Sequence, residues 1–515
     1  MRAPAVALTN AEISATTNSG NAGSLTLTDA ATLNATNSSL TTESTTGAGG
    51  SIALKGTTAV NLTGTTVSAT VKGGSQPGGN ITMTAPAVTV AGGSVTAESA
   101  GAGQAGSILV NANTIGVSNG AQLSSSSTGA GAGGTVTLAG LGPAGTKASS
   151  ISLDGTAATG PSGLFSSASG AGDGGSIDVA GSAVSLANGA TMSAASSGSG
   201  KSGSIAVNAD LLTLSPGSSI TAASTGEGNA GTISLSAPAG FNNTGGVVST
   251  SAAHGVGGDV TITAGQVLMN SGALVSASSQ GAGDAGSITI NSGIQFISKD
   301  SAVTTQATQA SGGNITIHAI DMFRLTNSQI NTSVAGGPNT IGGNINIDPN
   351  YVILQNSQIV AQAFEGQGGN INIVANVFLL DANSIVDASS QLGVSGTVNI
   401  QSPISNLSGA IAPLPDKGIN AAALIRASCA ARFAGGNRSS LVQRGRDTLP
   451  ADPGTGLVTS PLLAGGTLVA SIQAELEQNP SRLLAKSERE INQEFQSFIH
   501  IEGTPSLEEQ GYCRS

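Results

Sequence analysis

Few side chains in this sequence have the types and spacing that catalysis or metal binding needs. The histidines, His254, His318 and His500, are too scattered along the chain to form a ligand set. Asp173 and Asp284 both follow a Gly-Ala-Gly tripeptide, but they lie four repeats apart in the periodic sequence described below. That separation corresponds to roughly 20 Å between stacked strands. We therefore expect that the protein is not an enzyme and that it binds no cofactor and no metal ion.

Five arginines are the densest group of charges that suits ligand binding. They fall within 21 residues that contain no acidic side chain, and they are Arg426, Arg432, Arg438, Arg444 and Arg446. Their functional interpretation is contact with an anionic ligand such as lipopolysaccharide or another polysaccharide. The alternative is structural, because the arginines can also pair with the acidic repeats or with the Glu-rich helix expected behind them.

The chain has two cysteines, Cys429 and Cys513, which both lie near its C-terminal end. If the protein is exported, two cysteines favour one disulfide, which would tie the end of the chain to the segment around Cys429. Two free thiols remain the alternative.

The composition is that of a repetitive folded protein. Its 515 residues include 75 glycines and no tryptophan, and 9% of the residues are charged. Residues 1–400 contain 7 Lys/Arg and 17 Asp/Glu, whereas residues 401–515 contain 10 and 11, so charge density changes near residue 400. The net charge of −11 and the lack of a basic stripe argue against nucleic-acid binding. No apolar run is long enough for a transmembrane segment.

An internal repeat dominates the sequence. The motif is a small residue, a fixed glycine, a small polar residue and then two aliphatic residues that flank one other residue. Successive glycines are 26–30 residues apart, except for one interval of 41. The fixed glycines are Gly23, Gly50, Gly79, Gly106, Gly134, Gly175, Gly203, Gly231, Gly258, Gly286, Gly313, Gly343, Gly369 and Gly396.

Each repeat contains three short strand patterns followed by a Gly/Ser/Ala-rich stretch. The aliphatic pair after the glycine, for example Ile288/Ile290, has the period of two that places side chains on one face of a strand. Three such strands cannot bury their apolar face alone, but stacked repeats can. The sequence thus predicts an all-β fold, a right-handed parallel β-helix of about 14 coils of ~27 residues and roughly 65–70 Å long. We expect glycine to supply the positive φ angles at its corners.

Two other all-β folds fit this pattern less well. A β-propeller blade needs about 40–45 residues with aromatic markers, and an antiparallel sandwich does not require a fixed repeat length.

The periodicity also predicts the domain organisation. Residues 1–405 form the β-helix shaft, with an insertion at about 140–162 that contains two Gly-Pro pairs. Residues 406–465 form a Pro/Gly/Arg-rich irregular cap, which shields the strand edges of the last coil. Residues 466–515 form a helical tail, in which Ile491, Phe495 and Phe498 share one face. The C-terminal cap segment therefore contains α-helix, which we expect to dock on the rod, a partner site being the alternative.

These features resemble the filamentous haemagglutinin-type exoproteins of two-partner secretion systems in Gram-negative bacteria. The resemblance covers the Gly-Gly-Ser-Ile-x-Ile repeats of residues 10–400. It also covers the C-terminal stretch from Ile425 to Pro453, with its Ile-Arg-Ala-Ser-Cys and Leu-Pro-Ala-Asp-Pro motifs. The N-terminal secretion domain of that family has no counterpart here.

The resemblance implies a secreted or surface-displayed adhesin shaft that mediates attachment, aggregation or biofilm contacts. Its expected partners are an outer-membrane two-partner secretion pore, for the full-length protein, and host-cell or polysaccharide surfaces. The start of the chain shows no signal peptide, so we expect a fragment of a longer open reading frame, folded as a monomeric rod. The alternatives are a polysaccharide-acting β-helix lyase or hydrolase and a passive surface-layer protein.

Overall fold

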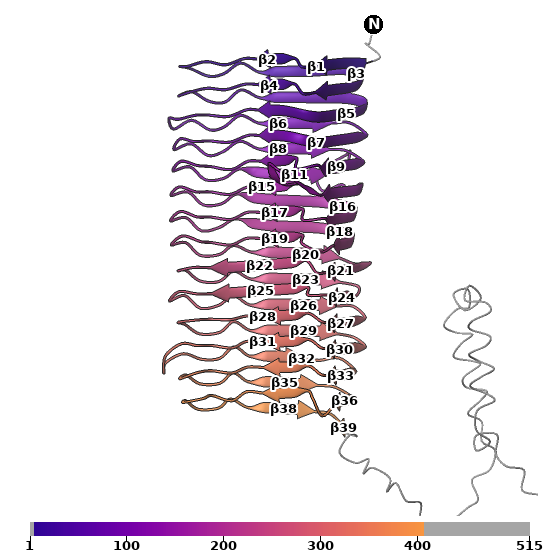
Figure 1. The fold of residues 1–515 in the computed structure, drawn as a ribbon, viewed down its shortest axis with the longest axis vertical. Coiled ribbons are helices and arrows are strands. Elements are labelled where there is room, and N and C mark those ends of the chain that lie inside the picture. Colours follow the sequence, from indigo (N-terminus) through magenta and orange to yellow (C-terminus); the bar gives the residue numbers. More distant parts are fainter. Residues whose placement is uncertain (1–4, 406–515) are drawn as a thin grey trace, which may run out of the picture. The chain divides into compact units, whose positions relative to one another are not determined.

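A computed structural model describes residues 5–405 of the chain, which form a parallel β-helix of about fourteen coils (Figure 1). Each coil passes along three strand positions, here called faces 1, 2 and 3. A Gly/Ser/Ala-rich rim loop then leads to the next coil. No helix occurs within the described residues, and the fold class predicted from the repeat is confirmed.

The strands are distributed over the three faces. Five long strands continue around at least one corner, β3 (Leu25–Thr36), β5 (Ile52–Ser68), β7 (Ala87–Thr96), β16 (Ser176–Ala187) and β18 (Ser204–Leu214). The other strands of face 1 are β6 (Ile81–Thr84), β8 (Ile108–Asn111), β11 (Thr135–Ala139), β20 (Ile233–Ala237), β23 (Val260–Ala264), β26 (Ile288–Ser292), β29 (Ile315–Ala319), β32 (Ile345–Ile347), β35 (Ile371–Val374) and β38 (Val398–Gln401). The other strands of face 2 are β1 (Ala5–Thr9), β9 (Thr114–Ser118), β12 (Ala148–Asp154), β21 (Gly240–Thr244), β24 (Val267–Asn270), β27 (Gln295–Lys299), β30 (Met322–Thr326), β33 (Tyr351–Gln355), β36 (Val377–Leu380) and β39 (Ile404–Ser405). The other strands of face 3 are β2 (Glu12–Ser14), β4 (Ser39–Thr41), β10 (Gln122–Ser124), β15 (Gly163–Phe165), β17 (Thr191–Ser193), β19 (Ser219–Thr221), β22 (Val247–Ala252), β25 (Leu274–Ser279), β28 (Ala302–Thr304), β31 (Gln329–Asn331), β34 (Gln358–Val360) and β37 (Ile385–Asp387).

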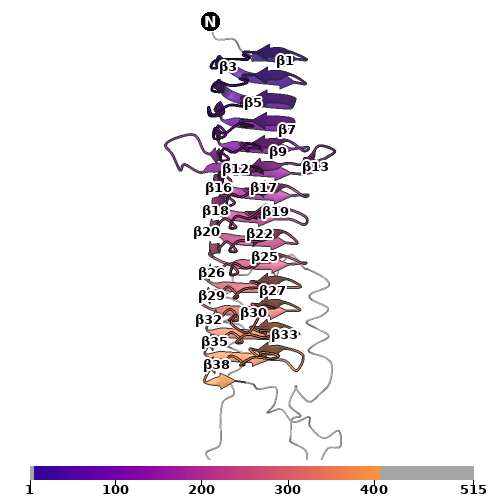
Figure 2. The same cartoon turned by 90° about the vertical axis from the view of Figure 1, so that its left-hand side faces the viewer.

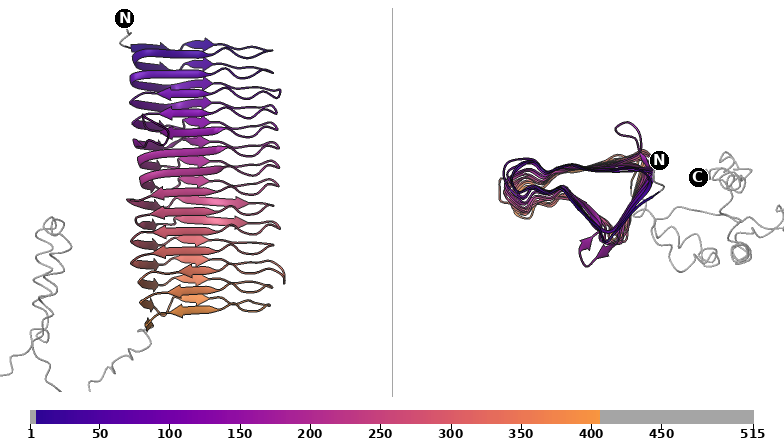
Figure 3. Two further views of the ribbon diagram at one scale, coloured as in Figure 1. Left: turned by 180° about the vertical axis from the view of Figure 1, so that it is seen from behind. Right: turned by 90° about the horizontal axis from the view of Figure 1, so that it is seen from above.

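Equivalent strands of successive coils pair in parallel and in register. On face 1, Ile288 pairs with Ile315, which pairs with Ile345, and that in turn with Ile371. The view along the axis shows a triangular outline with the rim loops at one corner (Figure 3). Seen from the N-terminal end, the chain runs clockwise as it recedes, which is the right-handed sense that parallel crossovers favour.

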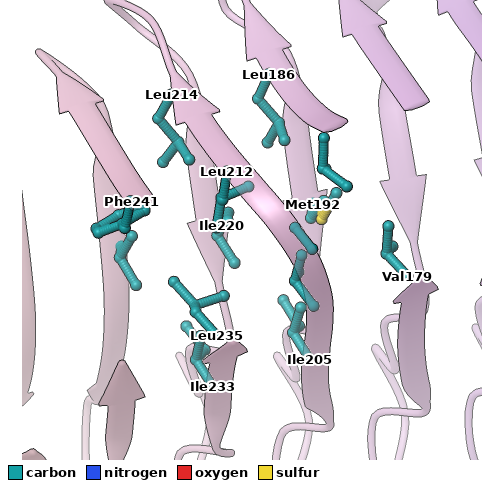
Figure 4. Close-up of a cluster of buried hydrophobic side chains, with 14 of the residues drawn as sticks. Val179, Leu186, Met192, Ile205, Leu212, Leu214, Ile220, Ile233, Leu235 and Phe241 are labelled. Atoms are coloured by element: carbon teal, nitrogen blue, oxygen red, sulfur yellow. The ribbon is translucent and has the colours of Figure 1, made fainter. Parts of the chain in front are cut away.

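The core is a continuous column of aliphatic side chains inside the triangle. The alternating burial of the strands places every second residue inside, so that Ile205, Leu212 and Ile220 of one coil lie close to Ile233 and Leu235 of the next (Figure 4). Phe296 and Phe323, both fully buried, stack with ring centroids 5.2 Å apart. Burying such aliphatic and aromatic side chains contributes roughly 1.5–3 kcal/mol each and is the main source of stability.

Glycines at the corners do supply positive φ angles, as expected, for example Gly120, Gly189 and Gly272. The fixed glycines have a different role. None of them has a positive φ angle, so left-handed backbone is not the reason for glycine. From Gly50 to Gly396, a Cβ on the fixed glycine would instead overlap the carbonyl oxygen of the fixed glycine one coil earlier. Glycine recurs because two backbones pass too closely there for any side chain.

Asparagine also adopts left-handed backbone conformation, beside glycine, at the corner between faces 2 and 3. Positive φ angles occur there at Asn37, Asn119 and Asn356 among others, because asparagine tolerates this region better than most residues. In the later coils, the Asn356 amide donates to Asn327 Oδ1 and the Asn327 amide donates to Asp300 Oδ1, both at 2.9 Å. The corner is therefore held by hydrogen bonds between side chains of successive coils.

The expected insertion at about 140–162 consists of two separate excursions. One is the loop 140–147 between faces 1 and 2, and the other is a small antiparallel hairpin of β13 (Thr156–Ala157) and β14 (Gly160–Pro161). They project from different sides at the same level (Figure 2). Between them, β12 is a regular face 2 strand that pairs with β9 and β16, because Ile151 and Leu153 continue the buried pattern.

Replacing a fixed glycine by alanine is expected to destabilise the shaft. In Gly286→Ala, the new Cβ would overlap the Gly258 carbonyl oxygen, and relieving that overlap costs about 1–3 kcal/mol. Gly116→Ala is the matched control, because its Cβ would meet Thr89 Cγ2 at an ordinary 3.8 Å. Thermal unfolding followed by circular dichroism should show a lower midpoint for Gly286→Ala alone. Equal midpoints for the two variants would contradict the steric role.

Candidate functional site

A cleft of ≈ 640 Å³ lies at the corner between faces 1 and 2, in the last coils that the structure describes. We call it the overhang cleft. Its lining comes from five successive corners and consists of Ser292, His318, Ala319, Ile320, Asp348, Pro349, Asn350, Val374, Ala375, Asn376, Gln401, Ser402 and Pro403.

The cleft arises where the corner becomes one residue shorter from one coil to the next. Between the buried Ile317 and Phe323 the corner holds residues 318–322, whereas between Ile347 and Val352 it holds residues 348–351. The next coil repeats the shorter corner. Ile320 belongs to the longer corner, and it is 72% exposed where it lines the cleft. The longer corner therefore overhangs the shorter ones.

His318 and Asp348 form the one hydrogen-bonded pair of a histidine and a carboxylate among the described residues of this cleft. His318 Nδ1 lies 2.5 and 2.7 Å from the two carboxylate oxygens of Asp348, one coil further along the chain. Both side chains are about half exposed. A carboxylate that contacts Nδ1 orients the imidazole and leaves Nε2 directed elsewhere, as in many hydrolases.

The cleft lacks the further groups that such chemistry requires. Its two serine hydroxyls donate to backbone carbonyls, Ser292 Oγ to Gln295 and Ser402 Oγ to Asn376 and Ile404. Neither is bonded to His318, so no nucleophile–base pair is present. Asp348 is the single carboxylate of the lining, whereas most glycosidases use two. Within residues 5–405, no three His, Cys, Asp or Glu side chains gather as metal ligands would.

The carboxylates singled out in the sequence contact the neighbouring coil instead of one another. Asp173 Oδ1 accepts a hydrogen bond from the backbone N–H of Lys201 at 3.0 Å, and Asp284 Oδ1 accepts one from Ser311 at 2.9 Å. Both side chains satisfy backbone donors of the following coil. His254 lies 4.0 Å from Glu227 and forms no ligand set.

The pairing of His318 with Asp348 was not expected from the sequence, in which the three histidines are scattered. The signal was available, because each residue follows a fixed glycine, Gly313 or Gly343, by five positions. Equivalent positions of successive repeats stack directly, so their side chains become neighbours. The predicted arginine cluster (Arg426, Arg432, Arg438, Arg444, Arg446), the Cys429–Cys513 pair, the cap and the helical tail all lie outside the described residues.

Three aspartates among the described residues, Asp210, Asp381 and Asp387, have lowered pKa values. A hydrogen bond from Lys147 Nζ, in the first excursion, lowers the pKa of Asp210, and the two groups lie 2.6 Å apart. In the last coils, a hydrogen bond from Ser384 Oγ lowers the pKa of Asp381, with a further contribution from the backbone N–H of Asn356. In their charged form, these carboxylates accept hydrogen bonds from adjacent segments and so stabilise the contacts between them.

Acid is therefore expected to loosen the last coils. Because the folded-state pKa of Asp381 is lowered, its contribution to stability is present above the ordinary aspartate pKa and is lost as the pH falls below it. The protection of the Asn356 amide against hydrogen exchange, relative to the intrinsic rate at each pH, should fall in acid, and in Asp381→Asn it should be lower already at neutral pH.

Asp321→Asn is the control, because the Asp321 carboxylate is exposed and hydrogen-bonds no described residue. If Asp381→Asn left the exchange of Asn356 unchanged, the carboxylate would not hold this corner.

Comparison with known proteins assigns the chain to no family. No known family, no curated protein and no solved structure matches the chain. Within residues 5–405 the structure has no helix that is long and apolar enough to cross a membrane.

Proposed function

We propose that this chain is the shaft of a secreted or surface-displayed adhesin, which mediates attachment or aggregation without catalysis. The observation that carries the proposal is the unbroken stack, in which all three faces pair from coil to coil between β1 and β39. Such a stack is a stiff spacer with an extended lateral surface.

The surface of the shaft supports binding by many weak polar contacts. Charged residues are sparse, and the outward positions carry mainly Ser, Thr and Asn, as in Thr261 and Thr263 of β23. Those that point outward alternate with buried residues, so they form columns along the axis at the strand spacing of ~4.8 Å. Many equivalent contacts on one rigid body give avidity without a deep pocket.

The secretion route in this proposal rests on the sequence resemblance. A full-length protein of the filamentous haemagglutinin type would leave a Gram-negative cell through an outer-membrane two-partner secretion pore. The chain would then act at the outer cell surface or outside the cell, on host-cell or polysaccharide surfaces.

A polysaccharide-acting enzyme is the second candidate, because the His318–Asp348 pair lies in a cleft that crosses several coils. Against it stand the single carboxylate of the lining and the two serine hydroxyls that are bonded to backbone carbonyls.

Adhesion can be measured with the full chain coupled to beads. Beads that carry the folded chain should retain bacterial cells, host cells or insoluble polysaccharides, whereas beads that carry the heat-denatured chain should not. Equal retention by the two bead types would refute a role for the folded shaft.

The same polysaccharides should be assayed for new reducing ends and unsaturated products after incubation with the free chain. We expect no release above buffer. Release that disappears in His318→Ala would establish the enzyme and reject the adhesin shaft.

A further inference from the structure

The overhang cleft has the features of a binding site for a particular class of polymer. We propose that it binds a linear, uncharged glycan that lies parallel to the shaft axis. This inference rests on the proposed adhesive function and adds to it one defined contact site and one ligand class.

The shape of the cleft suits an extended polymer. Its lining comes from five successive corners, so it spans four steps of strand stacking, or about 19 Å along the axis. That length exceeds a single sugar ring.

The lining combines apolar and polar groups. Ile320 and Val374 are 72% and 41% exposed, and they offer apolar surface of the kind that packs against the C–H faces of sugar rings. Pro349 and Pro403 extend this surface along the cleft. Phe323, three residues after Ile320, is buried and stacks on Phe296 of the preceding coil, which anchors the chain at the end of this corner.

Two asparagines supply hydrogen-bonding groups in a fixed orientation. Asn376 Nδ2 donates to Asn350 Oδ1 at 3.0 Å, which fixes both amide planes. The second N–H of Asn376, its Oδ1 and the Nδ2 group of Asn350 have no partner among the described residues, and they can bond to hydroxyls. Gln401 adds a third amide one coil further.

The charge of this region indicates an uncharged ligand. The residues that line the cleft include no lysine or arginine, so the lining offers no fixed positive charge to a sulfate or uronate group. The Asp348 carboxylate, which would attract a cation, faces His318 at hydrogen-bonding distance. Amides and apolar side chains remain, and they suit neutral hydroxyl groups.

The test uses calorimetric titration of the full chain with neutral oligosaccharides. The panel comprises α- and β-linked glucose, mannose, galactose and N-acetylglucosamine oligomers, from the monosaccharide to the hexasaccharide. At least one series should bind with an affinity that rises with oligomer length and then levels off once the cleft is filled. Polygalacturonate and heparin should not compete.

Two variants locate the site. Asn376→Ala and Ile320→Ser each change an exposed side chain, and each should weaken binding about tenfold, as the loss of one good contact does. Asn113→Ala is the matched control. Asn113 occupies the same corner position outside the cleft, and its N–H bonds to Pro86 as that of Asn376 bonds to Asn350. The control should bind like the wild type.

The outcomes separate the two proposals. If the beads retain cells or polysaccharides but no neutral oligomer binds, or if Asn376→Ala and Ile320→Ser bind normally, the cleft assignment is wrong and the adhesive shaft stands. Competition by polygalacturonate or heparin would also overturn the uncharged ligand class. If the folded chain retains nothing and binds no oligomer, both proposals fail.

Discussion

Close parallel stacking of one coil on the next is the constraint on which the rest of this structure depends. Each coil forms backbone hydrogen bonds with its neighbours and packs its apolar side chains against theirs, so no coil is stable alone. The constraint is tightest at the fixed glycines, where a Cβ would overlap the carbonyl group of the preceding coil. The sequence repeats because this contact repeats, and the low charge follows as well, since equivalent side chains lie directly above one another.

The fold could be predicted because its two main signals are local. Pairs such as Ile288/Ile290 reveal which side of a strand is buried, and the nearly constant interval between glycines reveals which strands are neighbours. The positive φ angles of glycines at the corners were predicted. The reason for the fixed glycines could not be predicted, because it is a short distance between the backbones of two coils. The sequence predicted one insertion where the structure has two excursions separated by a strand. Ile151 and Leu153 form a short strand pattern that flanking loop residues obscure.

The site was much harder to find from the sequence. His318 and Asp348 are 30 residues apart, and they appear related only when each is counted from its own fixed glycine. The overhang depends on a single residue more or less between Ile317 and Phe323 and between Ile347 and Val352. A difference of that size lies within the variation of the repeat length, 26–30 residues. Its consequence becomes visible when the coils are stacked.

The direction of the hydrogen bonds also has a mechanical consequence. In a parallel β-helix the bonds between coils point along the long axis, so a pull on the two ends loads them one after another instead of all together. The shaft would therefore yield by peeling, one coil at a time. Each released coil of ~27 residues can extend to about 90 Å. A tether of this kind is rigid under sideways load and lengthens in steps under tension, which limits the force that reaches whatever holds its far end.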